Sequence, residues 1–315
     1  MAIGPSRKAA PVTAIVLTLN EEENLGACLE SVAGWARDVL VVDSGSTDRT
    51  TEVAHRYGAR VVTHPFETHA RQWKWAFASL PKSTEWILAL DADQRVTPPL
   101  RDEIAKVVAR EGDARGRPPA GCYLKRKQIF RGRWIKHGGY YPKYLLKLFR
   151  RSEVWVDESD LVDHHFRVRG EVLKLAGDLI EENRNEADIS VWVAKHNRYA
   201  MLQAREEFEA AHGMRRRDVG RSLLGSPDER VEWLKSIWVR LPLYVRPCLY
   251  FLYRYVFRLG FLDGKEGFVF HVLQAFWYRL LVDVNLDDLR QAATAGPRPE
   301  ARAEIGRRSG DASGE

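Results

Sequence analysis

The stretch "WILALDADQRVT", residues 86–97, passes from an apolar run directly into two aspartates one residue apart. Such a continuous run is typical of a strand buried on both faces of a parallel sheet. Asp91 and Asp93 would then lie at the carboxyl end of that strand, where ligands bind in open α/β sheets. The alternative is an ordinary turn before a helix that begins near Thr97, since aspartate is common in turns. The triplet alone favours the turn.

Earlier parts of the chain repeat the same pattern. Short apolar or β-branched runs, typical of strands, occupy residues 12–19, 38–44 and 59–64. Helical patterns separate the strand-like runs at residues 22–33, 48–57 and about 70–80, and Asp48 is placed to cap the second helix. This alternation predicts an α/β layer with right-handed crossovers.

Polar side chains follow three of these predicted strands. Thr18, Asn20 and Glu21 end the first, Asp43 and the turn containing Ser46 end the second, and Asp91 and Asp93 end the fourth. These ends would face one crevice, with side chains suited to a nucleotide or a cation. Because the three ends coincide, a ligand site is favoured over a simple turn for Asp91 and Asp93. The chain has neither a G-x-G-x-x-G dinucleotide motif nor a P-loop.

Composition limits the class of protein. The 315 residues are 45% hydrophobic and 29% charged, which describes an ordered globular chain, and the net charge of +6 favours anionic partners. Three widely spaced cysteines, Cys28, Cys122 and Cys248, argue against a disulfide framework and a zinc cluster. We expect neither an export signal at the N-terminus nor a conventional membrane-spanning helix.

After residue 120 the pattern changes. Strands are expected at 120–130 and 143–151, joined by the loop "RGRWIKHGGYYP", and one long amphipathic helix at 188–211. The loop could bind an acceptor through its aromatic and basic residues, or could be a Gly-rich hairpin with snorkelling side chains. RNA binding fits the buried strands and paired carboxylates less well.

The segment 232–283 is rich in Trp, Tyr, Phe and Leu, with recurring arginines. Aromatic and arginine belts on amphipathic helices suit the interface of an anionic membrane. The alternative is a helical subdomain that packs its aromatics on the core. We expect a mixture of both.

In order, "TAIVLTLNEEENLGACLESV", "VLVVDSGSTDRTTEVA" and "EWILALDADQRV" resemble family 2 of the glycosyltransferases, which has the GT-A fold. The similarity is greatest to bacterial enzymes of lipopolysaccharide-core and exopolysaccharide assembly, and covers roughly residues 11–285. "RWIKHGGYYPKYLLKLFRR" and "VAKHNRYAMLQARE" resemble the same subgroup.

The resemblance implies a nucleotide-diphosphate sugar bound across the first strand ends, with Mg²⁺ or Mn²⁺ on the DxD motif. Asp93 would hold the metal, and Asp91 would approach the sugar or ribose and the metal. The other implied donor-binding residues are Thr18, Asn20, Glu21, Asp43, Ser46, Arg71 and Lys74. An exposed, solvated lysine is an equally good interpretation of Lys74.

Members of this family usually invert the anomeric centre, with a carboxylate as base. Relatives often read V-H-E-H at a position where this chain reads Val162-Asp163-His164-His165. The glutamate of the family pattern therefore aligns with His164. Asp163 is the first choice of base, and the alternatives are Glu158, Asp160 and His164. The two histidines could instead simply end a strand.

The sequence therefore predicts an α/β protein with a GT-A, Rossmann-like, mostly parallel sheet of the nucleotide-diphospho-sugar transferase type and a C-terminal helical, membrane-interface region. The expected parts are a flexible N-terminus (1–10), a catalytic domain (11–185), a helical membrane-associating region (186–290) and a disordered tail (291–315).

The expected function is that of an inverting, metal-dependent hexosyltransferase. It would move sugar from a nucleotide-diphosphate sugar, with UDP-sugar favoured, to a lipid-linked or membrane-borne glycan at the inner face of the cell membrane. The product would serve bacterial cell-surface polysaccharide or lipopolysaccharide assembly. No nucleic-acid partner is expected, and the protein would be cytoplasmic and peripheral on an anionic membrane surface. A nucleotidyltransferase and a non-catalytic, membrane-associated nucleotide-sugar-binding protein remain as alternatives.

Overall fold

The structure is a computed structural model of the 315-residue chain, and it describes residues 9–109, 119–156, 166–213, 224, 233–234 and 236–295. Its contacts form two compact units, residues 1–196 with 250–275 and residues 197–249 with 276–315. The sequence predicted a boundary after residue 185. The first unit instead keeps the start of the following helix and includes a later helical segment.

A mixed sheet is the framework of the first unit. Its strands are β1 (Ala10–Thr18), β2 (Ala36–Asp43), β3 (Arg60–Thr63), β4 (Trp86–Asp91), β5 (Gln94–Val96), β6 (Gly121–Phe130), β7 (Arg133–Trp134), β8 (Lys143–Arg150) and β11 (Val172–Glu182). They lie in the order β3-β2-β1-β4-β8-β6-β11-β5, with β7 beside β6. A separate small sheet pairs β9 (Val154–Val156) with β10 (Phe166–Val168). Pairing is parallel from β3 to β4 and between β6 and β11, while β8, β7 and β5 pair antiparallel with their neighbours.

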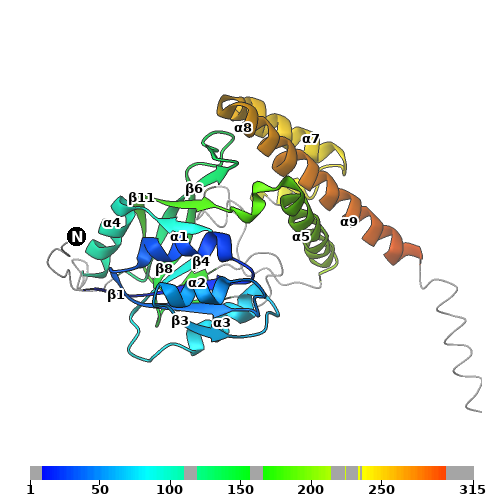
Figure 1. Cartoon of the computed structure of the whole chain (residues 1–315). Coiled ribbons are helices and arrows are strands. Elements are labelled where there is room, and N and C mark those ends of the chain that lie inside the picture. Colours follow the sequence, from blue (N-terminus) through cyan, green and yellow to red (C-terminus); the bar gives the residue numbers. More distant parts are fainter. Residues whose placement is uncertain are drawn as a thin grey trace, which may run out of the picture. The chain divides into compact units, whose positions relative to one another are not determined.

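Helices cover both faces of this sheet (Figure 1). They are α1 (Glu22–Val32), α2 (Thr50–Arg56), α3 (His69–Ala78) and α4 (Pro98–Val108). Helices α1, α2 and α4 share one core with Val16 and Leu88, whereas α3 shares another with Ile15 and Ile87. Because successive strand side chains point to opposite faces, burial of both faces explains the continuous apolar runs of the sequence.

The α/β class, the first strands and helices, and the helical C-terminal region are confirmed. Observed elements match the predicted ranges in the first hundred residues to within two positions at each end. Strand β11 was not predicted. Its buried residues Leu175, Gly177 and Leu179 alternate along the strand, and a register shift between Lys174 and Asp178 interrupts its pairing with β6.

The described part of the C-terminal region is helical. Its elements are η1 (Asn185–Ala187), α5 (Ile189–Ala211), α7 (Val245–Leu252), η2 (Tyr253–Phe257), η3 (Gly260–Asp263), α8 (Gly264–His271), η4 (Val272–Trp277) and α9 (Tyr278–Ala295). Helix α9 extends to Ala295, into the segment predicted as a tail. Among the described residues, no helix is both long and apolar enough to cross a bilayer.

The second unit has its own small core. Ala200 and Ala204 of α5 pack with Tyr278, Val282 and Leu286 of α9. Inside the same unit, the buried guanidinium of Arg246 pairs with the Asp283 and Glu207 carboxylates. A buried cation of this kind is tolerated because both anions and hydrogen bonds compensate for lost hydration.

Candidate functional site

The carboxyl ends of β1 and β2 meet at Thr18 and Asp43, which lie opposite each other in the parallel register. The Asp43 carboxylate is 2% exposed. It accepts hydrogen bonds from the Thr18 hydroxyl at 3.0 Å, from the Gly45 and Ser46 backbone N–H groups at 3.0 and 2.8 Å, and from the Ser46 hydroxyl at 2.5 Å. A carboxylate offers about four acceptor positions, so the turn and Thr18 together use all of them. In this structure Asp43 holds the turn.

Asn20 links the same two strand ends from the other side. Its backbone lies in the left-handed region at φ 56°, a conformation that asparagine tolerates better than most residues. The Asn20 N–H donates to the Ser46 hydroxyl at 2.8 Å, and the Thr47 N–H donates to Asn20 Oδ1 at 2.8 Å. The predicted donor-binding residues Asn20 and Ser46 therefore lie together and fix the shape of the loop pair.

Asp91 ends β4 and lies beside Leu17 of β1. The Lys147 ammonium of β8, itself 4% exposed, donates to Asp91 Oδ2 at 2.8 Å, and Gln94 Nε2 donates to the same oxygen at 2.8 Å. The Asp91 side chain remains 41% exposed. One of its oxygens is thus committed to the protein while the side chain still reaches solvent.

Asp93 differs from Asp91 because no residue in the described ranges donates a hydrogen bond to its carboxylate. Burial, and then the neighbouring carboxylates of Glu181 and Asp91, raise the pKa of Asp93 well above its usual value. Glu181 is itself held by Gln94 Nε2 at 2.8 Å and by Arg126 at 2.9 Å. Asp93 is therefore the least compensated anion of this strand end.

A divalent cation fits the chemistry of this position. Mg²⁺ prefers hard oxygens and often takes one or two carboxylates together with substrate phosphates. Asp93 offers such a carboxylate amid excess negative charge, whereas Asp91 is committed to Lys147. Within the described ranges, no three His, Cys, Asp or Glu side chains form a metal cluster by themselves. Donor phosphates would have to supply further ligands.

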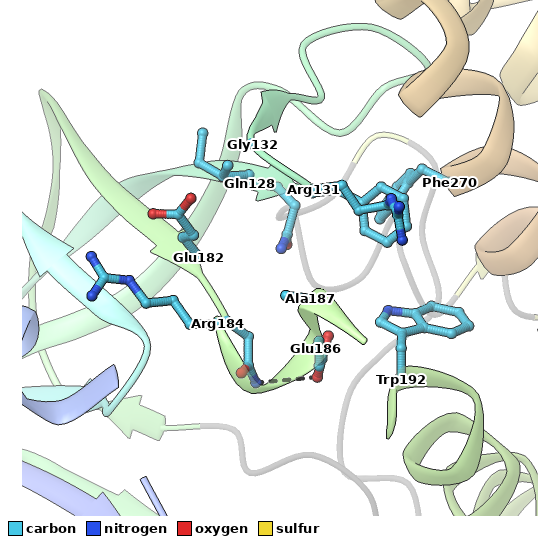
Figure 2. Close-up of a pocket in the computed structure, with 12 residues that line it drawn as sticks. Gln128, Arg131, Gly132, Glu182, Arg184, Glu186, Ala187, Trp192 and Phe270 are labelled. Carbon is cyan, nitrogen blue, oxygen red and sulfur yellow. Dashed lines mark hydrogen bonds between the residues drawn. The ribbon is translucent and has the colours of Figure 1, made fainter. Parts of the chain in front are cut away.

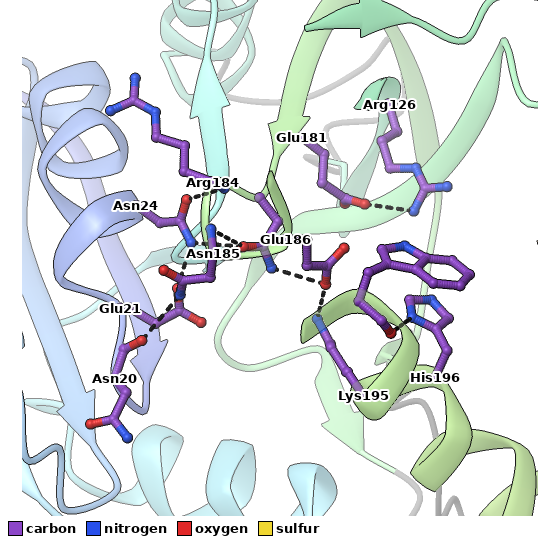
Figure 3. A network of polar contacts seen from close by, with 12 residues as sticks. Asn20, Glu21, Asn24, Arg126, Glu181, Arg184, Asn185, Glu186, Lys195 and His196 are labelled. Atoms are coloured by element: carbon purple, nitrogen blue, oxygen red, sulfur yellow. Dashed lines mark hydrogen bonds and ion pairs between the residues drawn. The ribbon is translucent and has the colours of Figure 1, made fainter. Parts of the chain in front are cut away.

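Glu21 belongs to a polar network that joins the end of β1 to the end of β11 (Figure 3). Asn24 Nδ2 donates to Glu21 Oε2 at 2.7 Å, and the Arg184 N–H donates to Asn24 Oδ1 at 2.8 Å. Asn185 Nδ2 donates to Glu21 Oε2 at 3.2 Å. Burial is the main cause that raises the pKa of Glu21, while the Lys195 ammonium opposes the rise.

A pocket of about 130 Å³ adjoins the end of β11 (Figure 2). Its walls combine the aromatic rings of Trp192 and Phe270 with the polar side chains of Arg131, Glu182 and Glu186. Lys195 Nζ, from the helix that carries Trp192, donates to Glu186 at 2.7 Å. An apolar wall facing several hydrogen-bonding groups is the usual composition of a small-molecule site.

The remaining predicted donor residues lie on α3, which reaches the β2 end through another side chain. The buried Gln72 donates to the Ser44 hydroxyl at 3.1 Å and to the His64 carbonyl at 3.1 Å. Arg71 is exposed and pairs with Glu67 one turn earlier, and Lys74 is exposed. The structure does not bring Arg71 and Lys74 into the hydrogen-bonded cluster.

The four candidates for the base, Glu158, Asp160, Asp163 and His164, lie outside the described residues and stay predictions. Lys147, Gln94 and Glu181 were missed by sequence reasoning. A lysine in the otherwise apolar strand "KYLLKLFR" was the available signal for Lys147. Gln94 and Glu181 become neighbours only through the antiparallel pairing of β5 with β11.

Comparison with known proteins supports the N-terminal part of this picture. Residues 13–151 match the model of glycosyl transferase family 2. The lipopolysaccharide core biosynthesis glycosyltransferase LpsC of Rhizobium meliloti (strain 1021) is 28% identical over 211 residues, covering 64% of this chain and 73% of that protein. An uncharacterized glycosyltransferase of Rickettsia bellii is 36% identical over 104 residues, 33% of this chain and 35% of that protein. The chain thus spans about a third of the length of its Rickettsia relatives.

Two solved structures show more distant likenesses. The mannosyltransferase PcManGT from Pyrobaculum calidifontis, in complex with GDP-Man and Mn²⁺, is 15% identical, with 98% of this chain and 81% of that chain covered and a TM-score of 0.42. Glucosyl-3-phosphoglycerate synthase from Mycobacterium tuberculosis, in complex with Mg²⁺ and UDP, is 23% identical, with 38% and 44% covered and a TM-score of 0.28. At these scores neither likeness bears on the roles of individual residues.

Proposed function

Because the chain belongs to glycosyl transferase family 2 through residues 13–151, we propose that it transfers a hexose from a nucleotide-diphosphate sugar, with UDP-sugar favoured, to a glycan acceptor. The family match contains every predicted donor-side residue, from Thr18 to Asp93. The four base candidates lie beyond it.

The observation that carries the proposal is the contrast among three adjacent strand ends. Those of β1 and β2 form a hydrogen-bonded floor around Asp43. That of β4 adds the carboxylate of Asp93, which accepts no hydrogen bond from the described residues and is opposed by more nearby carboxylates than the Lys195 ammonium offsets. A nucleoside would lie against the floor of Thr18, Asn20 and Ser46, and its diphosphate would extend towards Asp93. The arrangement follows the general rule that ligands bind beyond the carboxyl ends of parallel strands.

Asp93 would hold Mg²⁺ or Mn²⁺, the cation of the DxD motif, with Asp91 next to it. When bound, such a cation neutralises charge on the leaving diphosphate. Lys147 and Gln94 keep the Asp91 carboxylate oriented beside it through their hydrogen bonds of 2.8 Å. Relief of repulsion among Asp93, Asp91 and Glu181 would favour cation binding.

Chemically, an acceptor hydroxyl oxygen would attack the anomeric carbon, the bond from that carbon to the diphosphate oxygen would break, and the hydroxyl proton would pass to a carboxylate base. Single displacement of this kind inverts the anomeric centre. Asp163 is the proposed base, with Glu158, Asp160 and His164 as the alternatives. The sugar of the acceptor would enter beside Trp192 and Phe270, at the pocket that adjoins β11.

We further propose a lipid-linked glycan as the acceptor, in the assembly of cell-surface polysaccharide, with the enzyme peripheral on the inner face of the membrane. Two observations support this. LpsC, a relative named for lipopolysaccharide core biosynthesis, aligns over 73% of its length. The segment 232–283 is dense in aromatic residues and arginine.

A thermal-shift titration tests the donor site. UDP, GDP, CDP and TDP are each added with and without Mn²⁺, and one nucleotide, expected to be UDP, should raise the Tm in a Mn²⁺-dependent way. Asp93→Ala should abolish the Mn²⁺ dependence, and Asp163→Asn should keep nucleotide binding while losing transfer. No stabilisation by any nucleotide would contradict the proposal. Retained transfer by Asp163→Asn would move the base to Glu158 or Asp160.

A further inference from the structure

The segment from Leu252 to Leu262 exposes large apolar side chains at a density found nowhere else in the described first unit. We call this surface the apolar face, and define it by Leu252, Val256, Phe257, Leu259, Phe261 and Leu262, which are between 43% and 70% exposed. Exposed apolar residues scattered singly are ordinary, whereas a contiguous group marks an interaction surface.

The members of the apolar face are contiguous. Leu252 and Val256 lie four residues apart on one helical side. The chain then turns tightly, because the Leu259 N–H donates to the Val256 carbonyl at 3.1 Å and the Leu262 N–H donates to the Leu259 carbonyl at 3.1 Å. Phe261 packs on the Tyr255 ring at 6.3 Å, and Phe268 of α8 packs on the same ring at 5.6 Å. The Tyr255 ring thus contacts both Phe261 of the apolar face and Phe268 of α8.

The charges around the apolar face are mainly cationic. Arg258 and Lys265 are exposed, and Glu266 is half-buried. Asp263 is 2% exposed and is occupied by His137, whose N–H and Nδ1 lie 2.8 and 2.6 Å from its two oxygens. An apolar surface flanked by accessible cations complements anionic lipid headgroups, since basic residues close to such a membrane are attracted to it.

The apolar face is fixed rigidly to the catalytic unit. The Arg254 guanidinium donates to the Gly138 carbonyl at 2.6 Å, and the Gly138 N–H donates to the Arg258 carbonyl at 2.8 Å. A Cβ at Gly138 would overlap the buried ring of His271, so the loop and the helices fit closely. Movement of the face would therefore move the loop that joins β7 to β8.

From these observations we infer that the apolar face inserts into the headgroup layer of an anionic bilayer and docks the catalytic unit there. Phe270, two residues after Phe268 on α8, lines the pocket proposed for the acceptor sugar. The short helix α8, whose Phe268 packs on the same Tyr255 ring as Phe261 of the apolar face, therefore also lines the acceptor pocket. The inference deepens the proposed function, because it states how the enzyme reaches a lipid-linked acceptor.

Leu259 provides a separate sign of this role. Its backbone lies at φ 60°, in the left-handed region where glycine is usual after a helix, yet it presents a leucine side chain to solvent. Leu259→Gly should relieve the backbone while removing apolar surface. This variant should therefore be as stable as the wild-type protein or more stable, while its affinity for lipid falls.

Vesicle flotation of the full chain tests the inference, using phosphatidylcholine vesicles with and without phosphatidylglycerol. The wild-type protein should float with the anionic vesicles. Phe257→Ser with Leu262→Ser should lower the bound fraction by roughly tenfold or more, since two inserted side chains are lost. The matched control is Tyr57→Ser with Phe66→Ser, two residues that are 41% and 46% exposed and do not belong to the apolar face, and it should float like wild type.

Two further variants separate lost docking from lost folding. Leu259→Gly should float less than wild type at an unchanged or raised Tm. Arg258→Glu with Lys265→Glu should weaken binding to anionic vesicles and not to neutral ones. The inference is overturned if the wild-type protein stays at the bottom with both vesicles, if Phe257→Ser with Leu262→Ser floats normally, or if that variant instead converts a wild-type dimer into a monomer.

The nucleotide titration tests the donor site separately from the docking surface. Phe257→Ser with Leu262→Ser should keep the Mn²⁺-dependent rise in Tm with UDP, because neither residue lies at the strand ends. A wild-type protein that floats without any nucleotide response would retain the docking surface and lose the donor assignment. A protein that responds to UDP and does not float would retain the donor site and lose the docking surface.

Discussion

Strands β2 and β4 belong to one sheet, with β1 between them. The carboxylates at their two ends have opposite surroundings. At the β2 end, Asp43 is buried and every acceptor position receives a hydrogen bond from the neighbouring turn and from Thr18. At the β4 end, Asp93 receives none from the described residues and shares its surroundings with Asp91 and Glu181. One anion is compensated by donors, while the other is crowded by further anions.

The difference separates a carboxylate whose acceptor positions are all used within the protein from one that accepts no hydrogen bond from the described residues. A fully hydrogen-bonded carboxylate stabilises the native state and has little left to offer a ligand. A crowded carboxylate costs folding free energy until a cation arrives, so the binding of that cation is favoured. The motifs "DSGSTD" and "DAD" look alike in the sequence, and only the geometry shows that their carboxylates have different surroundings.

Removal of Asp43 should have the largest effect on stability. Asp43→Ala leaves the Thr18 hydroxyl and the donors of Gly45 and Ser46 without an acceptor, and should lower the free energy of unfolding by about 3 kcal/mol. Urea unfolding measures the change. The isosteric variant Asp43→Asn keeps one acceptor oxygen and should lose about half as much. If Asp43→Ala unfolded at the same urea concentration as the wild-type protein, the hydrogen bonds to Asp43 would not stabilise the fold, and the proposed difference between the β2 and β4 ends would be wrong.

Loss of Lys147 should have the second largest effect. Lys147→Met leaves Asp91 next to Asp93 with no cation at 2.8 Å, and should destabilise the fold by about 2 kcal/mol. The control is Lys125→Met, because Lys125 makes a longer contact of 3.5 Å with Asp178 and should change stability by about 0–1 kcal/mol. If Lys147 acts through the crowded anions, adding Asp93→Asn to Lys147→Met should restore part of the loss. Equal losses in the two lysine variants would contradict the assignment.

The β2 end could largely be predicted from sequence, since its strand, its Ser/Gly turn and its helix are all local. The resemblance implied that Asp43 binds the nucleotide-sugar, and this stays a prediction. The sequence does not show how many N–H and O–H groups the turn and Thr18 direct at the Asp43 carboxylate. Asp48 was expected to cap the next helix. Its carboxylate accepts from the Thr50 N–H at 2.9 Å, and Arg49 occupies the position before the first helical residue.

The β4 end was harder to predict because its partners are distant in the chain. The pairing of β8 in the sheet brings Lys147 to Asp91. The pairing of β11 brings Glu181 to Gln94. Buried residues alternate along strand β11, but this alternation does not show that β6 and β5 are its neighbours in the sheet. Long-range pairing determines which side chains surround Asp93, and local patterns carry no information about it.

Asp93→Asn should shift stability in the opposite direction to Asp43→Ala. The amide removes charge repulsion from Glu181 and Asp91, so the metal-free protein should gain about 1 kcal/mol. Asp91→Asn should instead lose stability, because it weakens the ion pair with Lys147. Urea unfolding in EDTA measures both, and a titration with Mn²⁺ and UDP should show no metal dependence for Asp93→Asn. Destabilisation by Asp93→Asn would mean that its carboxylate is compensated like that of Asp43.

The smallest expected effect is the contribution of Asp48 to the pH dependence of stability. Asp48 is the second hydrogen-bonded carboxylate near the β2 end. Its surroundings are the Thr50 hydroxyl and N–H, the Glu22 N–H, and the Arg49–Glu22 ion pair. Burial acts to raise the pKa of Asp48, but the hydrogen bonds from Thr50 and Glu22 outweigh it, and the net pKa lies below the ordinary value of 3.8.

The unfolded chain therefore takes up this proton first as the pH falls, so the stability from Asp48 is present above about pH 4 and is lost through the lower folded pKa. Asp48→Asn should cost about 1 kcal/mol or less near neutral pH, and the gap from wild type should narrow at about pH 3. Urea unfolding at the two pH values measures the gap. A gap that stays constant would show that the Asp48 charge adds nothing to the β2 end, and that neutral hydrogen bonds alone hold this turn.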